Sequence, residues 1–272
     1  MISIQCHEET TAMIKSSMEK LAESAARRIR KVHTAQVGSG EELIELSHWA
    51  EKSELRLMLP VELLRMQGGY TYGPEHPFVR ALRLGQSSLV DFYIRVRPKN
   101  ICDFYNLKAT GRVGESLPPW EIPWLGSANR TPPPGERGLS EDHGISFYGP
   151  ATNAKIELEM KRLTHLRKTI EKNGYHPNLH GDISGYIVMD KIAATFLVRG
   201  GKHRAAVLAS LGNSHIPVCF KKRFPRLVSS ENADFWPLVK RGMIDRELAI
   251  QILRAYTRSH RNNQEAPYRS AN

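Results

Sequence analysis

Residues 196–220 read FLVRGGKHRAAVLASLGNSHIPVCF. An apolar run typical of a buried strand ends in the glycine pair 200–201, and an alanine-rich run typical of a helix follows. Glycines at such a junction let the backbone approach an anion, and the first helical N–H groups supply donors and partial positive charge. Lys202 adds a full charge, Arg204 can hold phosphate oxygens through two parallel bonds, and His203 can donate a hydrogen bond or accept a proton. These residues are compatible with a phosphate-binding turn or with a tight strand-to-helix turn whose side chains are solvated.

The residues around this junction indicate a compact α/β unit over residues 151–226. A helix is expected to begin at Thr152 or Asn153 and to end at Gly174. The runs HGDISGYIVMD and TFLVR then predict a hairpin, and a helix over 202–211 and the strand IPVCF follow. The expected order is therefore helix, strand, strand, helix, strand.

The preceding region, residues 1–114, is predicted to be α-rich. Apolar residues at helical spacing indicate a helix over 8–32 and a second over 41–49, and the segments FVRALRL and SLVDFYIRV also read as helices. A further short helix is expected to close near 103–107. LRLMLP at 55–60 reads as a strand that proline stops.

Residues 115–150 hold seven prolines and two tryptophans and are predicted to be a long loop. Its aromatic content favours an ordered segment packed over a domain, and a simple connector is the alternative. Residues 227–272 are predicted to form a helical extension with a loose tail. Phe235-Trp236-Pro237 would anchor this extension, and a helix is expected over 245–256.

Charge is distributed unevenly along the chain, whose formal net charge is +11. Residues 1–150 carry 18 basic and 18 acidic side chains, whereas residues 151–272 carry 21 and 10. The excess indicates an anionic partner such as nucleic acid, an anionic membrane face or phosphorylated small molecules, or else a solvated basic surface. Three widely spaced cysteines and the lack of a long apolar stretch predict a soluble, cytoplasmic protein without a transmembrane segment or a structural zinc site.

The pattern IEKNGYHPN, a hairpin, VRGGKHRAAVLASLG and then IPV resembles the ParB/sulfiredoxin superfamily over roughly residues 153–222. This resemblance implies a small mixed-sheet domain that binds a nucleotide or its phosphates at the turn. By the same resemblance Gly200, Gly201, Lys202, His203 and Arg204 would form the phosphate-binding turn. The nucleotide would be ATP, ADP or CTP, with magnesium.

The sequence differs from individual branches of that superfamily, and these differences reduce the number of activities to consider. The sulfinic acid reductases require a reactive cysteine where this chain has Lys202, so sulfur chemistry is not expected. The DNA-partitioning proteins continue into a helix-turn-helix domain, whereas about 45 residues with one clear helix follow residue 226 here, which disfavours specific DNA binding. The serine kinase branch has an aspartate at the position of Gly200, so an acid would have to come from elsewhere.

Asp182 and His203 are the candidate catalytic residues. In phosphoryl transfer a carboxylate or histidine orients the attacking hydroxyl. Asp182 lies before the strand that enters the hairpin, where it would act as base or metal partner or, alternatively, only cap a turn beside Gly181. His176 and His180 are read as loop histidines, and KKRFPR at 221–226 as edge protection or an extension of the positive surface.

The segments LPVELLRMQGGYTYGPEHPF, PPWEIPWL and FWPLVKRG resemble parts of uncharacterised bacterial proteins encoded among surface-polysaccharide genes. The resemblance implies a nucleotide ligand with a sugar or polyol as acceptor. The leading hypothesis is therefore a cytosolic nucleotide-binding protein that acts as a phosphotransferase on a small molecule or sugar precursor. A nucleic-acid-binding or nuclease protein and a non-catalytic nucleotide-sensing module are the alternatives.

Overall fold

The computed structural model describes residues 33–49, 55–108, 117–125, 138–145 and 148–258. The chain divides into two units, Met1–His33 and Thr34–Asn272, and the fold described below belongs to the second. The helix expected over residues 8–32 lies outside the described residues. No helix within the described ranges has an apolar stretch long enough to cross a membrane.

The described chain contains β-strands, α-helices and short 3₁₀ helices. The strands are β1 (His33–Gln36), β2 (Leu55–Pro60), β3 (Leu64–Arg65), β4 (Ser184–Asp190), β5 (Ala193–Gly200), β6 (His215–Phe220) and β7 (Leu227–Ser229). The α-helices are α2 (Gly40–Trp49), α3 (Pro77–Leu84), α4 (Gln86–Arg95), α5 (Ile101–Phe104), α7 (Asn153–Asn173), α8 (Pro177–His180), α9 (Lys202–Ser210), α10 (Pro237–Lys240) and α11 (Arg246–Thr257). Short 3₁₀ helices are η2 (Val61–Leu63), η3 (Glu141–His143) and η4 (Ser230–Phe235).

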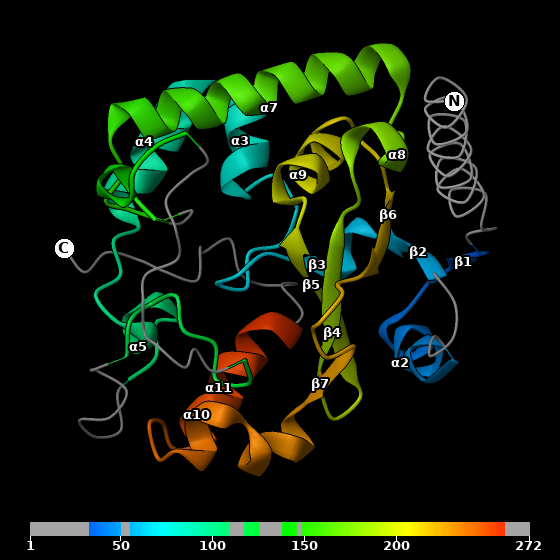
Figure 1. The fold of residues 1–272 in the computed structure, drawn as a ribbon, viewed down its shortest axis with the longest axis vertical. Coiled ribbons are helices and arrows are strands. Elements are labelled where there is room, and N and C mark those ends of the chain that lie inside the picture. The colour runs from blue at the N-terminus through cyan, green and yellow to red at the C-terminus, as the bar shows by residue number, and fades with distance from the viewer. Residues whose placement is uncertain (1–32, 50–54, 109–116, 126–137, 146–147, 259–272) are drawn as a thin grey trace, which may run out of the picture. The chain divides into compact units, whose positions relative to one another are not determined.

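The strands form one mixed sheet in the order β1-β2-β6-β4-β5-β3, and β7 also pairs with β4 (Figure 1). β4 and β5 make an antiparallel hairpin, and β2 pairs antiparallel with β6. β6 and β7 both run parallel to β4, β6 at Ser184 and Gly185 and β7 at Ile187 to Met189. The α/β class with a mixed sheet is therefore confirmed.

The sheet extends on both sides of the predicted 151–226 unit. β1, β2 and β3 come from the region predicted to be α-rich, and β7 comes from the region predicted as a helical extension. β2 pairs with β6 across the sheet, with Leu57 opposite Val218. Of these four, only β2 was expected, and the predicted segments share a single sheet instead of forming separate layers.

The central hairpin forms where the sequence predicts it, because its residues are apolar and it closes over a two-residue turn. Tyr186, Ile187 and Val188 in β4 are 0% exposed. So are Phe196, Leu197 and Val198 in β5, and runs buried on both faces are typical of central strands. The hairpin is the centre of the core.

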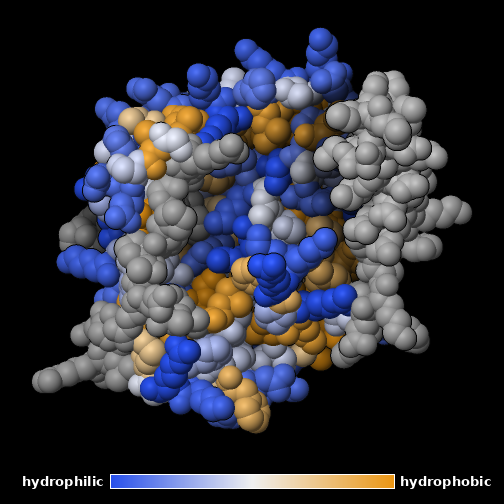
Figure 2. Space-filling model, viewed as in Figure 1, coloured by the Kyte–Doolittle hydropathy of each residue, from blue (hydrophilic) through white to orange (hydrophobic). Residues whose placement is uncertain are grey.

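α7 begins and ends at the expected residues. Thr152 is its N-cap and accepts a hydrogen bond from Lys155 N, and Gly174 ends it with a φ of 75°. Leu163, midway along the helix, is 0% exposed. α7 lies across α3, α4 and α9, and its outer surface is hydrophilic (Figures 1 and 2). It therefore closes one end of the core.

Residues 117–125 of the proline-rich loop pack against the rest of the fold. Leu117, Ile122 and Trp124 are buried. Trp124 Nε1 donates to the Tyr186 hydroxyl of β4 at 3.0 Å, and its ring lies 5.1 Å from that of Trp236. Trp236 is thus an anchor as predicted, whereas Phe235 is 76% exposed and is not.

Replacing Leu163 with alanine tests whether α7 is part of the same cooperative core. Because this side chain is fully buried, we expect Leu163→Ala to lower the free energy of unfolding by about 2 to 5 kcal/mol. Leu84→Ala is the control, since Leu84 is 61% exposed and its truncation should change stability by less than about 0.5 kcal/mol. Urea unfolding followed by circular dichroism measures both. Equal effects would contradict this packing.

Candidate functional site

The predicted strand-to-helix junction forms as a tight glycine turn. β5 ends at Gly200, Gly201 has the left-handed conformation with φ 77° and ψ 27°, and α9 begins at Lys202. A Cβ on Gly201 would lie 2.9 Å from Arg204 Nε and 3.0 Å from the Asp182 carbonyl oxygen. Glycine is required here both by the backbone conformation and by the close approach.

Arg204 connects the start of α9 to the segment that enters β4. Its Nη1 donates to the carbonyl of His180, and its Nη2 donates to the carbonyl of Asp182 at 2.9 Å. The two terminal nitrogens that we expected to face phosphate oxygens thus bond the backbone. In this geometry Arg204 positions the turn.

Asp182 lies beside the turn, where the sequence analysis expected it. Its carbonyl accepts from Arg204, and its carboxylate Oδ1 lies 2.8 Å from Nη2 of Arg56 in β2. The side chain of Asp182 is 51% exposed and that of Arg56 is 23% exposed. The carboxylate is therefore accessible to a ligand, and it is oriented by a neighbouring cation.

Positive charge surrounds the turn from three elements. Lys202 begins α9, Arg56 comes from β2, and Lys221 follows β6. A Cβ on Gly200 would lie 3.6 Å from Lys221 Nζ and 2.6 Å from Ser184 Oγ. Hydrophilic residues gather over the middle of this face, around α9 and the segment after β6 (Figure 2). The cations and the positive end of the α9 dipole favour an anion here.

His203 lies against an aromatic cluster from α3 and the segment that precedes it. Its ring centroid is 4.7 Å from that of Phe78, and Phe78 is 5.7 Å from His76. His76 stacks on Tyr72 at 4.3 Å, and both are about 1% exposed. His76 Nδ1 accepts from Phe78 N at 3.2 Å, so it caps the N-terminus of α3.

His76 presents a buried donor at this site. Burial, followed by the charges of His203 and Lys202, lowers the pKa of His76 to about 3, so its ring is neutral at physiological pH. Because Nδ1 accepts a hydrogen bond, the proton lies on Nε2. Among the described residues, neither Nε2 nor the Tyr72 hydroxyl has a hydrogen-bond partner. Buried donors of this kind normally meet an acceptor, and the ring of Phe78 connects His76 to His203 in the first turn of α9.

The structure brings together the predicted Gly200, Gly201, Lys202, His203 and Arg204, with Asp182 beside them. It adds four residues that the sequence analysis did not assign to the site. These are Arg56, Tyr72, His76 and Lys221. They come from β2, from the segment before α3 and from the segment after β6, and no spacing along the chain connects them to residues 200–204. Only Lys221 had a signal, its place in KKRFPR directly after the closing strand.

Two other histidines near the turn, His176 and His180, form hydrogen bonds within the segment before β4. The His176 backbone N–H donates to His180 Nδ1 at 3.0 Å, which agrees with a local role. Among the described residues no three His, Cys, Asp or Glu side chains are grouped so that they could hold a metal ion.

Comparisons with protein-family models, with curated proteins and with solved structures find no match to the chain. The resemblance to the ParB/sulfiredoxin superfamily stays a prediction from the motif. We therefore argue function from the geometry of the site.

A matched pair of variants separates two contributions to the stability lost when Gly201 is replaced: the steric clash of an added Cβ and the strain of the left-handed backbone. Gly212 has a similar φ of 81°, with no atom within 4 Å of an added Cβ. We expect Gly212→Ala to cost about 1 kcal/mol from backbone strain alone, and Gly201→Ala about 2 to 4 kcal/mol because Arg204 must also move. Chemical denaturation gives both values, and equal losses would contradict the tight turn.

Burial of neutral His76 makes stability depend on pH. Its pKa is 6.5 in an exposed state and about 3 in the fold. Below about pH 6.5 the unfolded chain therefore binds a proton that the folded chain does not, and the free energy of unfolding falls as the pH decreases. From about pH 7 to about pH 5 we expect the wild type to lose about 2 kcal/mol more than His76→Phe, which removes the titrating ring.

Urea unfolding of both proteins at the two pH values measures this difference. The other histidines contribute equally to both proteins. Parallel pH profiles would mean that His76 is solvated in the native state.

Proposed function

We propose that the chain binds a nucleotide through its phosphates at the start of α9. The observations that carry the proposal are a helix N-terminus that follows a glycine turn and the cations Lys202 and Lys221 beside it, with the buried Nε2–H donor of neutral His76 in the adjoining aromatic cluster. Phosphate oxygens are strong acceptors and carry negative charge, so they fit both the donor and the surrounding cations.

Each residue of the site has a distinct part in this proposal. Gly200 and Gly201 let the phosphates approach the backbone, and the first N–H groups of α9 hydrogen-bond to their oxygens. Lys202 and Lys221 neutralise charge from two sides. Arg204 keeps the turn in place through its two carbonyl bonds.

Phosphoryl transfer to a small hydroxylated acceptor is the reaction that these residues support best. Asp182 would orient the acceptor hydroxyl and take its proton, and Arg56 fixes the direction of that carboxylate. His203 would hydrogen-bond to the transferred group. Magnesium, when bound with the nucleotide, would neutralise phosphate charge. A sugar or polyol is the proposed acceptor class.

Two other functions remain as alternatives with their own signatures. A nucleic-acid-binding or nuclease protein is favoured by the excess of cations in residues 151–272, and its affinity would fall steeply with salt. A nucleotide-sensing module would bind without turnover. We also propose a cytoplasmic location, as the three widely spaced cysteines of the sequence predict.

Nucleotide titration by calorimetry tests the proposal directly. ATP, ADP and CTP are each added with and without magnesium to the wild type, to Lys202→Ala and to Lys191→Ala. Lys191 is an exposed lysine at the opposite end of the hairpin and is the matched control. We expect Lys202→Ala to weaken binding about tenfold, the scale of one charge-assisted hydrogen bond, and Lys191→Ala to have no effect.

If both lysine variants lose affinity equally, the nucleotide binds through the overall positive charge of the protein and not through a specific contact with Lys202. The absence of binding by any of the three nucleotides would overturn the proposal. Single-turnover assays with sugar and polyol acceptors then separate a phosphotransferase from a sensor. A strong salt dependence for DNA or RNA, without nucleotide binding, would favour the nucleic-acid alternative.

A further inference from the structure

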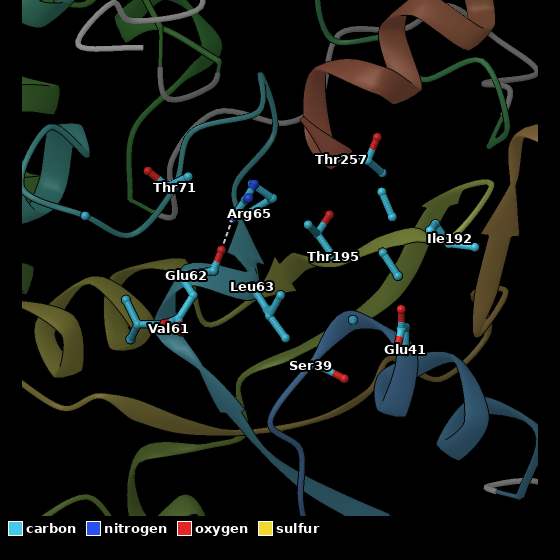
Figure 3. Close-up of a pocket in the computed structure, with 14 residues that line it drawn as sticks. Ser39, Glu41, Val61, Glu62, Leu63, Arg65, Thr71, Ile192, Thr195 and Thr257 are labelled. Carbon is cyan, nitrogen blue, oxygen red and sulfur yellow. Dashed lines mark hydrogen bonds between the residues drawn. The ribbon is translucent and has the colours of Figure 1, made fainter. Parts of the chain in front are cut away.

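A separate cavity of about 780 Å³ lies at the other end of β5 (Figure 3). It is bounded by the start of α2, by η2 and β3, and by residues 192–195 at the start of β5. Because β5 spans Ala193–Gly200, the cavity and the glycine turn are on the order of 20 Å apart. None of the residues assigned to the turn lines the cavity.

The cavity contains a buried cation, Arg65, which is 4% exposed. Arg65 Nε donates to the Tyr256 carbonyl at 3.0 Å, and Nη1 donates to the carbonyls of Leu64, at 3.0 Å, and Glu62. Nη2 makes none of these bonds. Among the described residues no carboxylate forms an ion pair with Arg65.

Arg65 keeps its charge despite its burial. Burial lowers the pKa of its guanidinium to about 10, and the charge of Glu62 partly offsets that effect. The group is therefore protonated at physiological pH. Nε donates its hydrogen bond to Tyr256, at the C-terminal end of α11. The two N–H groups of Nη2 can therefore donate to another acceptor. An oxyanion supplies both the acceptor and the missing negative charge.

The opposite wall of the cavity also favours a negative group and hydroxyls. Gly40 and Glu41 begin α2, a helix of 10 residues, and their N–H groups have no acceptor within the helix. Thr71, Thr195 and Thr257 add hydroxyl groups to the lining, and Figure 3 shows them around Arg65. Such side chains pair with the hydroxyl groups of a ligand.

Exposed carboxylates at the cavity limit how much negative charge a ligand can carry. Glu41 and Glu62 line it and are both exposed. They would repel a polyphosphate, whereas they would accept hydrogen bonds from ligand hydroxyls. The cavity volume also lies within the usual range for small-molecule sites.

We propose that this cavity is a second ligand site, for a small hydroxylated monocarboxylate of the sugar-acid class. Its carboxylate binds Nη2 of Arg65, and the first N–H groups of α2 on the opposite wall bind one of its hydroxyl oxygens. Its hydroxyl groups bind the threonines and the rim carboxylates. The site is independent of the nucleotide site at the turn.

Ligand binding can be blocked without altering Arg65. Ala193 is exposed and lines the cavity, so Ala193→Trp would fill it from the solvent side. Leu84→Trp adds the same ring at an exposed position outside the lining and is the matched control. Purified proteins are titrated with D-gluconate and D-glucuronate at millimolar concentrations, with D-glucose as the uncharged probe, and are followed by calorimetry and thermal unfolding.

We expect at least one of the two acids to bind the wild type and Leu84→Trp, and glucose not to bind. Ala193→Trp should weaken the acid by about tenfold or more, the scale of losing a charge-assisted contact. Arg65→Lys, if it folds, should weaken the acid as well. Nucleotide binding should be unchanged in Ala193→Trp, which separates the two sites.

Three results would overturn the proposal. These are no binding of either acid to the wild type, binding of glucose with the affinity of the acids, and unchanged acid affinity in Ala193→Trp. Because Ala193 is exposed, loss of folding is not expected for that variant, and thermal unfolding of the free protein checks this. Loss of nucleotide binding in all proteins would affect only the proposed function at the turn.

Discussion

The guanidinium of Arg204 fixes the start of α9 against the segment that enters β4. It lies between two glycines, since a Cβ on Gly181 would be 3.0 Å from Nη1 and a Cβ on Gly201 would be 2.9 Å from Nε. Both acceptors are backbone carbonyls, so the bonds set the path of the chain. β4 pairs with β5, β6 and β7, and the sheet and the helix are therefore oriented together around this one group.

The sequence predicts those helices and strands whose conformation depends on nearby residues. The cap at Thr152, the stop at Gly174 and the β4–β5 hairpin are of this kind, because capping and periodicity act over a few residues. β3 and β7 have two and three residues, too few to show a period, and they exist through pairing with distant strands. The site divides in the same way. Residues 200–204 are contiguous, whereas His76 and Lys221 join them only through the tertiary fold.

Two glycine pairs that look alike in the sequence have different roles. Gly68 and Gly69 both have positive φ values, whereas in the pair 200–201 only Gly201 has one. A Cβ added to Gly68 would lie 2.8 Å from the Phe104 ring, and one added to Gly69 would lie 2.5 Å from the Ala255 carbonyl. That pair lets a buried segment pack against its neighbours. The pair at 200–201 instead precedes a helix start beside several cations. A glycine in the sequence therefore indicates only that another group lies close to the backbone. Neighbouring charged residues indicate whether that group is a ligand or another part of the protein.

A short buried segment connects the two candidate sites. Arg65 lines the cavity, and two residues later Gln67 accepts a hydrogen bond from Arg199, the residue before the glycine turn, at 2.9 Å. Coupling between sites requires an element with two arrangements that the ligands populate differently. Residues 64–70 are all buried, and close-packed interiors resist such rearrangement. We therefore expect the segment to act as a rigid support, so that a ligand at one proposed site would leave the affinity of the other site unchanged.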